Sequence, residues 1–328
     1  MKRRVRVIEA GLLSTVQDRG RRNVAWLGVS GSGAVDWYSA RAANRLVGNS
    51  DDAPLVETTL TGAVLAAECE ARVAVTGASA AISVGRAGHE TWRSYEVAPG
   101  DEIVVGPASR GLRSYIAIDG GIDVPLVLGS ASTDLGAGMG GIDGRRLTSG
   151  DELPLGPRRT IPAAQRAFRA SQIPAWSPAV TLATTDGPHV AQLGRAAVRQ
   201  LRERAFRVSA ASSRQAIRLE GEPVDVAGQT DVVTGGVCPG CVQIASDGMP
   251  VLLLAEHQST GGYATALCVI TAHLPRAAQL RPGEAVRFSR ATYAEAADAL
   301  DVSVRKLSRA YDVCAGAPLS AGFLEGLP

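Results

Sequence analysis

Short β-prone runs separated by strong turn signals are the feature that most constrains the fold of this chain. Residues 72–76 and 113–118, for example, roughly alternate apolar and polar side chains, as half-buried strands do. Turn-forming Gly, Pro, Asp and Ser residues interrupt the runs, at positions 99–101, 119–121, 149–151, 247–248 and 281–283. Because helices do not alternate regularly with the runs, the pattern favours a barrel or sandwich over a parallel βαβ sheet. The sequence therefore predicts a mainly β fold.

The length of 328 residues predicts two domains. A turn that pairs Gly with an acidic residue and opens a strand recurs at residues 100–103, 150–153 and 283–286, which suggests two similar halves. Residues 157–178 mix Pro, Ala and Arg without strand alternation. We therefore expect an N-terminal domain over residues 1–160, a linker over residues 161–178 and a C-terminal domain over residues 179–328.

Two helices are predicted from their end signals. Asp36 can cap a helix that runs through Leu46, and Gly48 can stop it. Pro188 is a favourable first-turn residue for a second helix, which we expect to continue to about Arg204.

A third helix is predicted near the C-terminus, where Thr292 and Glu295 form a capping box. Its apolar residues fall on one stripe, made of Leu300, Val304, Leu307, Tyr311 and Cys314. We expect this stripe to pack on a barrel, and a partner-binding surface is the less favoured alternative.

Charge and hydropathy exclude several classes of partner. The 34 basic residues nearly balance the 32 acidic ones, so no overall basic field attracts nucleic acid or an anionic membrane. No run reaches the roughly 18 apolar residues of a membrane span, and the N-terminus lacks an apolar signal region. The five cysteines are few and odd in number, which argues against a disulfide framework. We expect a cytoplasmic protein that binds neither nucleic acid nor membrane.

Familiar catalytic motifs are absent from the sequence, including the phosphate-binding loop, the nucleophile elbow and the dinucleotide fingerprint. The segment 238–241 is a Cys-x-x-Cys motif, which can be a redox dithiol or half of a zinc site. Its central Pro-Gly pair is more typical of a turn between strands, and no second ligand pair follows at metal-binding spacing. We therefore favour a turn here and expect no metal site in this chain.

Three polar, glycine-rich segments are the candidate ligand sites. Residues 15–36 combine Gly with Gln, Asp, Arg and Ser, which suit a small polar ligand. Residues 255–263 follow the apolar run 251–254, and barrels present ligand groups from such loops, although a surface hairpin fits the composition equally well. Residues 186–189 open the second predicted helix, where free N–H groups could hold a carboxylate or phosphate.

The order and the amino-acid sequences of many motifs resemble those of one family. It is the allophanate hydrolase subunit 2 family, also called biotin-dependent carboxyltransferase or KipA-like proteins, and it includes the C subunit of 5-oxoprolinase. The matching motifs are collinear, cover almost the whole chain and lie at residues 10–21, 32–36, 43–49, 57–59, 111–115, 120–125, 128–133, 150–153, 187–188, 218–221, 239–243, 247–250, 258–263 and 278–280.

The resemblance implies two tandem cyclophilin-like β-barrels with a few peripheral helices. It also implies a partner, a subunit 1 protein that is also called the B subunit or KipI-like. The sequence departs from the family pattern in two places. Residues 212–216 read Ser-Ser-Arg-Gln-Ala where the family has Ser-Asn-Arg-Met-Gly, and Glu256 replaces an Asp. The longer Glu side chain moves its carboxylate by about 1 Å, which is enough to alter substrate choice.

Three activities follow from the resemblance. The favoured one is ATP-dependent opening of 5-oxoproline, because the sequence lacks carrier, biotin carboxylase and amidase segments. The first alternative is transfer of a carboxyl group from carboxybiotin, supplied by another protein, to a urea-like amide. The second is a KipA-type regulator without catalysis that binds a kinase-inhibitor partner. ATP would be used in the assembled complex.

The resemblance and the polar segments together suggest ten site residues. Both reactions need donors for developing negative charge and groups that orient an amide. Anion holding is expected of Arg21, Arg214 and the helix start at Gly187. The candidate catalytic residues are Asp18, Arg214, Gln243, Gln258 and Tyr263, and the candidate substrate-binding residues are Gln17, Arg21, Gly187, Gly261 and Gly262. Asp36 and Glu57 are expected to be structural.

Overall fold

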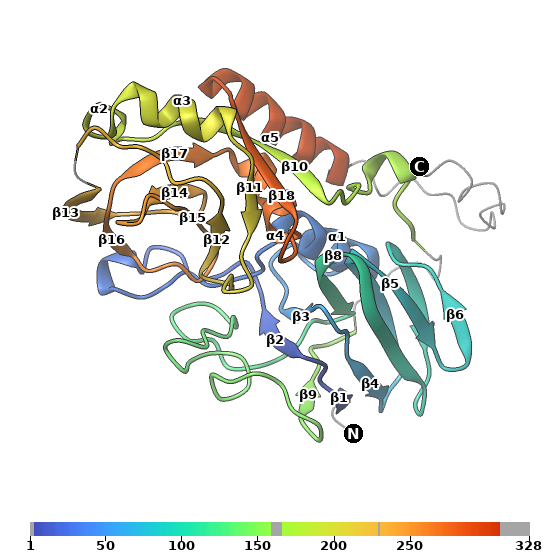
Figure 1. Cartoon of the computed structure of the whole chain (residues 1–328). Coiled ribbons are helices and arrows are strands. Elements are labelled where there is room, and N and C mark those ends of the chain that lie inside the picture. The colour runs from blue at the N-terminus through green and yellow to red at the C-terminus, as the bar shows by residue number, and fades with distance from the viewer. Residues whose placement is uncertain (1–2, 159–165, 229, 309–328) are drawn as a thin grey trace.

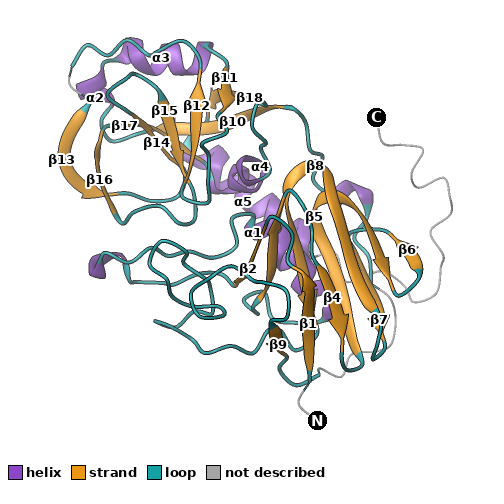
Figure 2. Ribbon diagram, turned by 60° about the horizontal axis from the view of Figure 1, so that its bottom comes forward, coloured by secondary structure: helices purple, strands orange, loops and turns teal. Residues whose placement is uncertain are grey.

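The computed structural model describes residues 3–158, 166–228 and 230–308. Figure 1 shows two β units side by side, with the N-terminal one coloured blue to green and the C-terminal one yellow to red. Figure 2 shows α1 and α4 in the region between the two units. The sheet of the first unit lies within residues 4–154 and the barrel of the second within residues 179–290. The exact domain bounds stay a prediction, since residues 159–165 are outside the described part.

The N-terminal unit is a nine-stranded antiparallel sheet. Its main path runs β2-β3-β8-β4-β1-β9, and β5 pairs with β6, β7 and β8. The strands are β1 (Arg4–Glu9), β2 (Leu13–Gln17), β3 (Leu55–Thr59), β4 (Val64–Ala67), β5 (Ala71–Val84), β6 (Ala87–His89), β7 (Arg93–Val97), β8 (Glu102–Ile118) and β9 (Glu152–Pro154).

The C-terminal unit is a closed barrel of order β10-β17-β14-β15-β12-β11-β18. The parallel pairing of β10 with β18 closes the ring, while its other pairs are antiparallel. Its strands are β10 (Ala179–Asp186), β11 (Phe206–Val208), β12 (Ala216–Glu220), β14 (Cys241–Ile244), β15 (Pro250–Leu253), β17 (Thr265–Val269) and β18 (Ala285–Arg290). Strands β13 (Asp231–Gly236) and β16 (Thr260–Tyr263) form a separate two-stranded sheet.

The predicted mainly β fold is confirmed, and a few helices lie around the two units. Of the two expected barrels, the C-terminal one is a closed barrel and the N-terminal one is a half-barrel sheet. The helices are α1 (Trp37–Val47), α2 (Val190–Leu193), α3 (Arg195–Glu203), α4 (Leu274–Ala278) and α5 (Tyr293–Ser308), with short 3-10 helices η1 (Ala25–Leu27), η2 (Ala170–Gln172) and η3 (Thr271–His273). None of the helices in the described ranges combines the length and the apolar content that crossing a bilayer requires.

The first two helix predictions have opposite outcomes. The helix α1 is confirmed, since the Asp36 carboxylate accepts from the Ser39 N–H at 2.9 Å and Gly48 ends the helix at φ 82°. The single helix from Pro188 to Arg204 is wrong. Gly194, at φ 87°, divides it into α2 and α3, and a helix cannot continue through that backbone conformation.

The capping box of α5 is confirmed, because Glu295 N donates to Thr292 Oγ1 at 3.2 Å and Thr292 N donates to the Glu295 carboxylate at 2.7 Å. The predicted stripe is wrong within the described residues. Leu307 is buried, but it packs with α1 rather than on the barrel, and Val304 is 39% exposed. Ala, Ser and Asp fill most other positions of α5, so the helix has little apolar surface to bury. Tyr311 and Cys314 lie outside the described residues.

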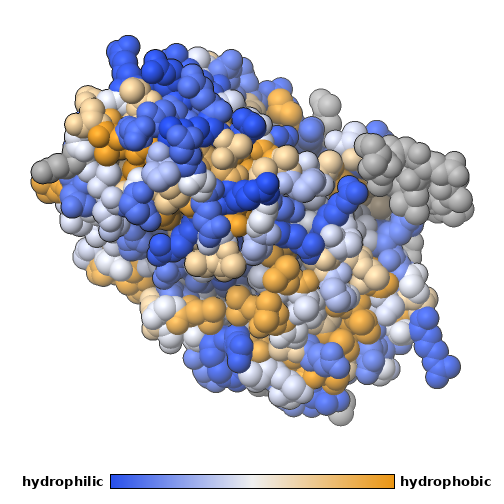
Figure 3. Space-filling view, in the orientation of Figure 1, coloured by the Kyte–Doolittle hydropathy of each residue, from blue (hydrophilic) through white to orange (hydrophobic). Residues whose placement is uncertain are grey.

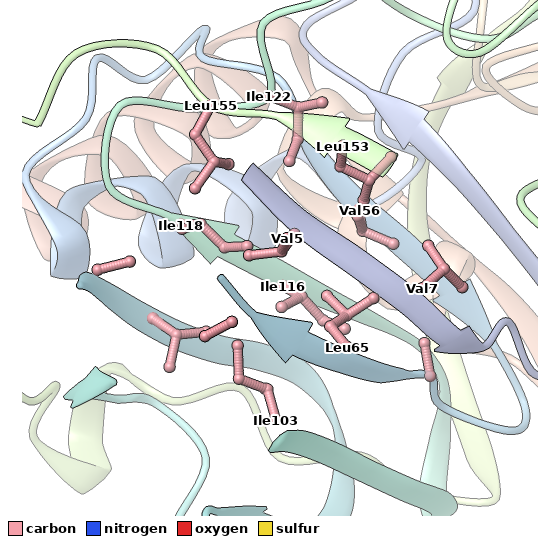
Figure 4. Packing of buried hydrophobic residues seen from close by; sticks show 14 of the residues in the cluster. Val5, Val7, Val56, Leu65, Ile103, Ile116, Ile118, Ile122, Leu153 and Leu155 are labelled. Carbon is pink, nitrogen blue, oxygen red and sulfur yellow. The ribbon is translucent and has the colours of Figure 1, made fainter. Parts of the chain in front are cut away.

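Each unit has its own apolar core. In the N-terminal unit Val5, Leu65, Ile103 and Ile116 pack between the strands (Figure 4). A second cluster fills the barrel around Phe206 and Phe288, and a third lies where α1 packs on the sheet. The outer face shown in Figure 3 is hydrophilic over α3, which carries three arginines. Val35, from the segment before α1, belongs to the barrel cluster, so apolar contacts also join the two units.

Candidate functional site

Residues 30–36, which connect η1 to α1, are bonded to predicted site residues from both units. The Gln17 amide oxygen accepts from Gly33 N at 3.2 Å, and Arg214 Nη2 donates to Gly33 O at 2.8 Å. Gly33 has φ 95°, and a Cβ there would lie 2.8 Å from the carbonyl carbon of Arg19. Only glycine fits this position. The turn therefore joins the two units through one required glycine.

Arg214 is the centre of a buried cluster of four charged side chains, which we call the junction cluster. Its Nε donates to Glu256 Oε1 at 2.7 Å, and its Nη1 pairs with Glu57. The fourth member is Arg113, whose Nε lies 3.7 Å from Glu57 Oε1. Two guanidinium groups thus balance two carboxylates across the junction.

The two arginines of the junction cluster differ in their electrostatics. Burial lowers the pKa of Arg214, but the Glu57 and Glu256 carboxylates outweigh burial and leave its pKa above the ordinary value. For Arg113, burial dominates and lowers the pKa, although Glu57 opposes it. Arg214 is thereby held as a cation that is bonded to both units, and its predicted catalytic role stays a prediction.

Arg214 and Glu256 also line a pocket of about 590 Å³ between the units, which we call the junction pocket. Its walls are mostly apolar, and Arg113 and Ser213 supply further polar groups. Mostly apolar pockets with a few convergent polar groups are typical of small-molecule sites. The apolar residues of the wall include Leu12, Leu60, Leu112, Leu135 and Leu280.

Asp18 is engaged within the N-terminal unit. Its carboxylate accepts from Gly20 N at 2.7 Å, Ala131 N at 2.7 Å, Ser130 Oγ at 2.6 Å and Ser132 Oγ at 2.5 Å. Four donors occupy a carboxylate almost completely. Asp18 therefore fastens the loop around residue 131 beside β2, and its predicted catalytic role stays a prediction.

Arg21 is buried and only partly bonded. Its Nε donates to Val127 O at 3.2 Å and its Nη2 to Ser132 O at 2.7 Å, while its buried Nη1 meets no acceptor in the described part of the chain. Burial lowers the pKa of Arg21, and nearby carboxylates, including Glu256, oppose the shift. The Nη1 atom is thus a buried donor without a partner among the described residues, and the anion-holding role of Arg21 stays a prediction.

A second group of predicted residues lies on β14 and β16. Gln243 is buried, and its Nε2 donates to Tyr263 O at 3.1 Å. A Cβ at Gly261 would lie 2.7 Å from that nitrogen, so the amide fits because residue 261 is glycine. Gly262 lies beside Tyr263 on β16. The side chains of Tyr263 and Gln258 are exposed and accessible to a ligand.

Gly187 does not provide the predicted anion site. Its N–H donates to Ala266 O at 2.9 Å, and a Cβ there would lie 2.4 Å from Thr265 O. The helix that follows begins only at Val190 and has four residues. The N–H of Gly187 is therefore used to join β10 to β17, and the prediction of a free donor at this residue is wrong.

Sequence reasoning missed Gln279 and Arg113 as members of the junction. Gln279 Nε2 donates to Asp36 Oδ2 at 2.8 Å, and its amide oxygen accepts from Arg113 N at 2.9 Å. Burial raises the pKa of Asp36 to about 6, although hydrogen bonds from Gln279 and Ser39 oppose the shift. The expected structural role of Asp36 and Glu57 is confirmed. Gln279 stood in a family motif, but no local signal paired it with Asp36.

Comparisons with known proteins agree with this architecture. The family model described as "Carboxyltransferase domain, subdomain A and B" matches residues 27–290. The 5-oxoprolinase C subunit of Escherichia coli is 33% identical over 292 residues, which cover 89% of this chain and 93% of that protein. The urea amidolyase of Lachancea kluyveri is 33% identical over 88% of this chain but only 17% of its own length.

A solved structure extends the likeness to three dimensions. The crystal structure of the K. lactis urea amidolyase has a TM-score of 0.88 and 29% identity over 97% of this chain and 20% of that chain. This chain therefore matches nearly the full length of the E. coli protein, but only a small part of each of the two urea amidolyases.

Proposed function

Because this chain belongs to the carboxyltransferase subdomain A and B family, which its motifs suggested, we propose that it is the C subunit of an ATP-dependent 5-oxoprolinase-type enzyme. The observation that carries the proposal is its match to 93% of the length of the E. coli 5-oxoprolinase C subunit. Its partner would be a B-type, KipI-like protein, and its substrate a small cyclic amide. We place the complex in the cytoplasm.

Opening a cyclic amide builds negative charge on the carbonyl oxygen, and fixed donors must stabilise that charge. Arg21 is proposed to hold the oxyanion or the substrate carboxylate, since its Nη1 is fixed and unbonded within the described residues. Gln258 and Tyr263 are proposed to orient the amide because their side chains are exposed.

The remaining predicted residues are proposed to position these groups. The course of β16 next to Tyr263 is set by Gln243 and Gly261. The segments around Arg21 are fixed by Gln17, Asp18 and Arg214. Gly262 is proposed to leave room for the substrate. ATP supplies the driving force in the assembled complex, and we assign none of its contacts to this chain.

Carboxyl transfer is the second candidate, supported by the TM-score of 0.88 to the K. lactis urea amidolyase. In that case carboxybiotin from another protein would enter between the units, and a urea-like amide would accept the carboxyl group. The same fixed donors would serve, because this reaction also builds charge on a carbonyl oxygen.

Reconstitution tests the proposal. The chain is mixed with its purified A-type and B-type partners, and ADP and glutamate are measured with 5-oxoproline as substrate. Release of both products only when all three proteins are present supports the oxoprolinase function. A stable complex without turnover rejects it, and addition of carboxybiotin and urea then separates carboxyl transfer from a purely regulatory, KipA-type role.

A further inference from the structure

Three cysteine thiols meet at one end of the barrel, and the proposed function uses none of them. Cys238 is exposed, Cys241 is buried and Cys268 is half-buried. The Sγ atoms of Cys238 and Cys241 lie 3.6 Å apart, and Cys241 faces Cys268 across the pairing of β14 with β17. We call these three residues the thiol cluster.

The segment 238–241 forms the predicted turn. Cys241 N donates to Cys238 O at 3.2 Å, and Gly240 adopts φ 96° after Pro239. Proline followed by a glycine with positive φ is typical of a type II turn, which keeps its end Cα atoms within about 7 Å. Disulfides form at Cα separations of roughly 4.4–6.8 Å. The turn therefore brings the two cysteines into disulfide range instead of excluding a dithiol.

The surroundings hold this turn in place. Gly240 N donates to Leu253 O at 2.9 Å, and a Cβ at Gly240 would lie 2.8 Å from Val269 O. Closing the sulfur–sulfur gap from 3.6 Å to a bond of about 2.05 Å thus needs side-chain rotation rather than a new backbone path.

The cluster also favours a reactive thiolate. Hydrogen bonds from the Cys238 and Cys268 thiols lower the pKa of Cys241, burial opposes the shift, and His257 adds a smaller lowering effect. Thiolates are the attacking species in thiol–disulfide exchange. Cys238, which is exposed, gives a small reagent access to the pair.

We propose that Cys238 and Cys241 form a redox modification site, which a small disulfide such as oxidised glutathione converts reversibly into an intrachain disulfide. The proposal stands on the geometry of the turn and is independent of the enzymatic activity. It adds a site to the chain beyond the proposed function.

The reaction balances in two exchange steps. The Cys241 thiolate attacks one sulfur of the small disulfide, forms a mixed disulfide and releases one small thiolate. Cys238, deprotonated by that thiolate, then attacks Cys241 Sγ and releases the second small thiolate. Counting the proton that Cys241 gives up to become a thiolate, the two cysteines lose two electrons and two protons, and the small disulfide becomes two thiols.

The test equilibrates the full chain with graded ratios of oxidised to reduced glutathione in the presence of a chelator. Acid quenching, alkylation and peptide mass spectrometry then report the state of each cysteine. We expect a peptide with Cys238 joined to Cys241, about 2 Da lighter than the reduced form and restored by dithiothreitol.

Variants separate the pairing from its alternatives. Cys238→Ser should abolish the linkage, whereas Cys268→Ala and the control Cys69→Ser should retain it. Full alkylation of Cys238 and Cys241 at the highest oxidant ratio would overturn the proposal. So would a Cys241–Cys268 linkage or a glutathione adduct on Cys238 that never resolves. Thiol state is measured without turnover, so failure here is distinct from failure of the oxoprolinase assay.

Discussion

Replacing Arg214 with Met tests whether the junction cluster holds the two units together. Methionine keeps a long apolar side chain but removes the charge. The change deletes the 2.7 Å bond to Glu256, the 2.8 Å bond to Gly33 O and the pair with Glu57. Both carboxylates stay buried, since their side chains are 1% and 6% exposed.

Removing one partner of a buried ion pair costs about 3–5 kcal/mol, because the other charge is left uncompensated. For a unit of this size, that loss lowers Tm by roughly 6–20 °C. Urea denaturation followed by tryptophan fluorescence, together with calorimetry, measures both quantities. The matched control is Arg199→Met, whose partner Glu203 is 4.0 Å away and exposed, and we expect a change below about 0.5 kcal/mol there.

A second variant isolates the cause of the loss. Adding Glu57→Gln and Glu256→Gln to Arg214→Met removes the buried negative charges, so it should recover part of the stability. An Arg214→Met protein within about 1 kcal/mol of the parent would refute the reasoning, because a buried arginine between two carboxylates cannot be neutral to remove.

Three further predictions concern single positions. The pKa of Asp36 is raised from 3.8 to about 6. Its contribution to the free energy of unfolding is therefore complete below pH 3.8 and is lost as pH rises through 6. That loss is worth about 3 kcal/mol, and Asp36→Asn should flatten the pH dependence of the urea midpoint; equal slopes for the two proteins would contradict this. Gln258→Ala should leave the urea midpoint within about 0.5 kcal/mol and reduce oxoproline turnover at least tenfold, and unchanged kinetics would remove Gln258 from the site. Gly33→Ala should cost about 1–3 kcal/mol, since φ is 95°, and a midpoint equal to the parent's would show that the turn relaxes freely.

Local signals allowed the sequence to predict the β fold and the ends of α1. The cap at Asp36 and the stop at Gly48 act on backbone groups within one turn of the helix, so neighbouring residues determine them. The break at Gly194 was not predictable in this way. Glycine inside a helical pattern costs only about 1 kcal/mol, so the sequence alone does not show that Gly194 adopts φ 87° and ends the helix there.

The sequence predicted which segments form the candidate site, but not the role of each residue in it. Asp18 and Gln258 stand in similarly polar, glycine-rich sequence, yet the first is saturated by four donors and the second is exposed. The pair of Arg214 with Glu57 joins residues 157 positions apart, and no local pattern encodes such a contact. Composition identifies groups able to bind a ligand, whereas only the folded chain shows which groups are already bonded.

The most direct test of the proposed function is the stoichiometry of ADP and glutamate released from 5-oxoproline by the chain together with its purified A-type and B-type partners. The proposal predicts equal amounts of the two products, loss of both when this chain is omitted, and loss of both with Gln258→Ala at unchanged stability. Glutamate release that is equally fast without this chain, or a fully assembled complex that releases neither product, would contradict it.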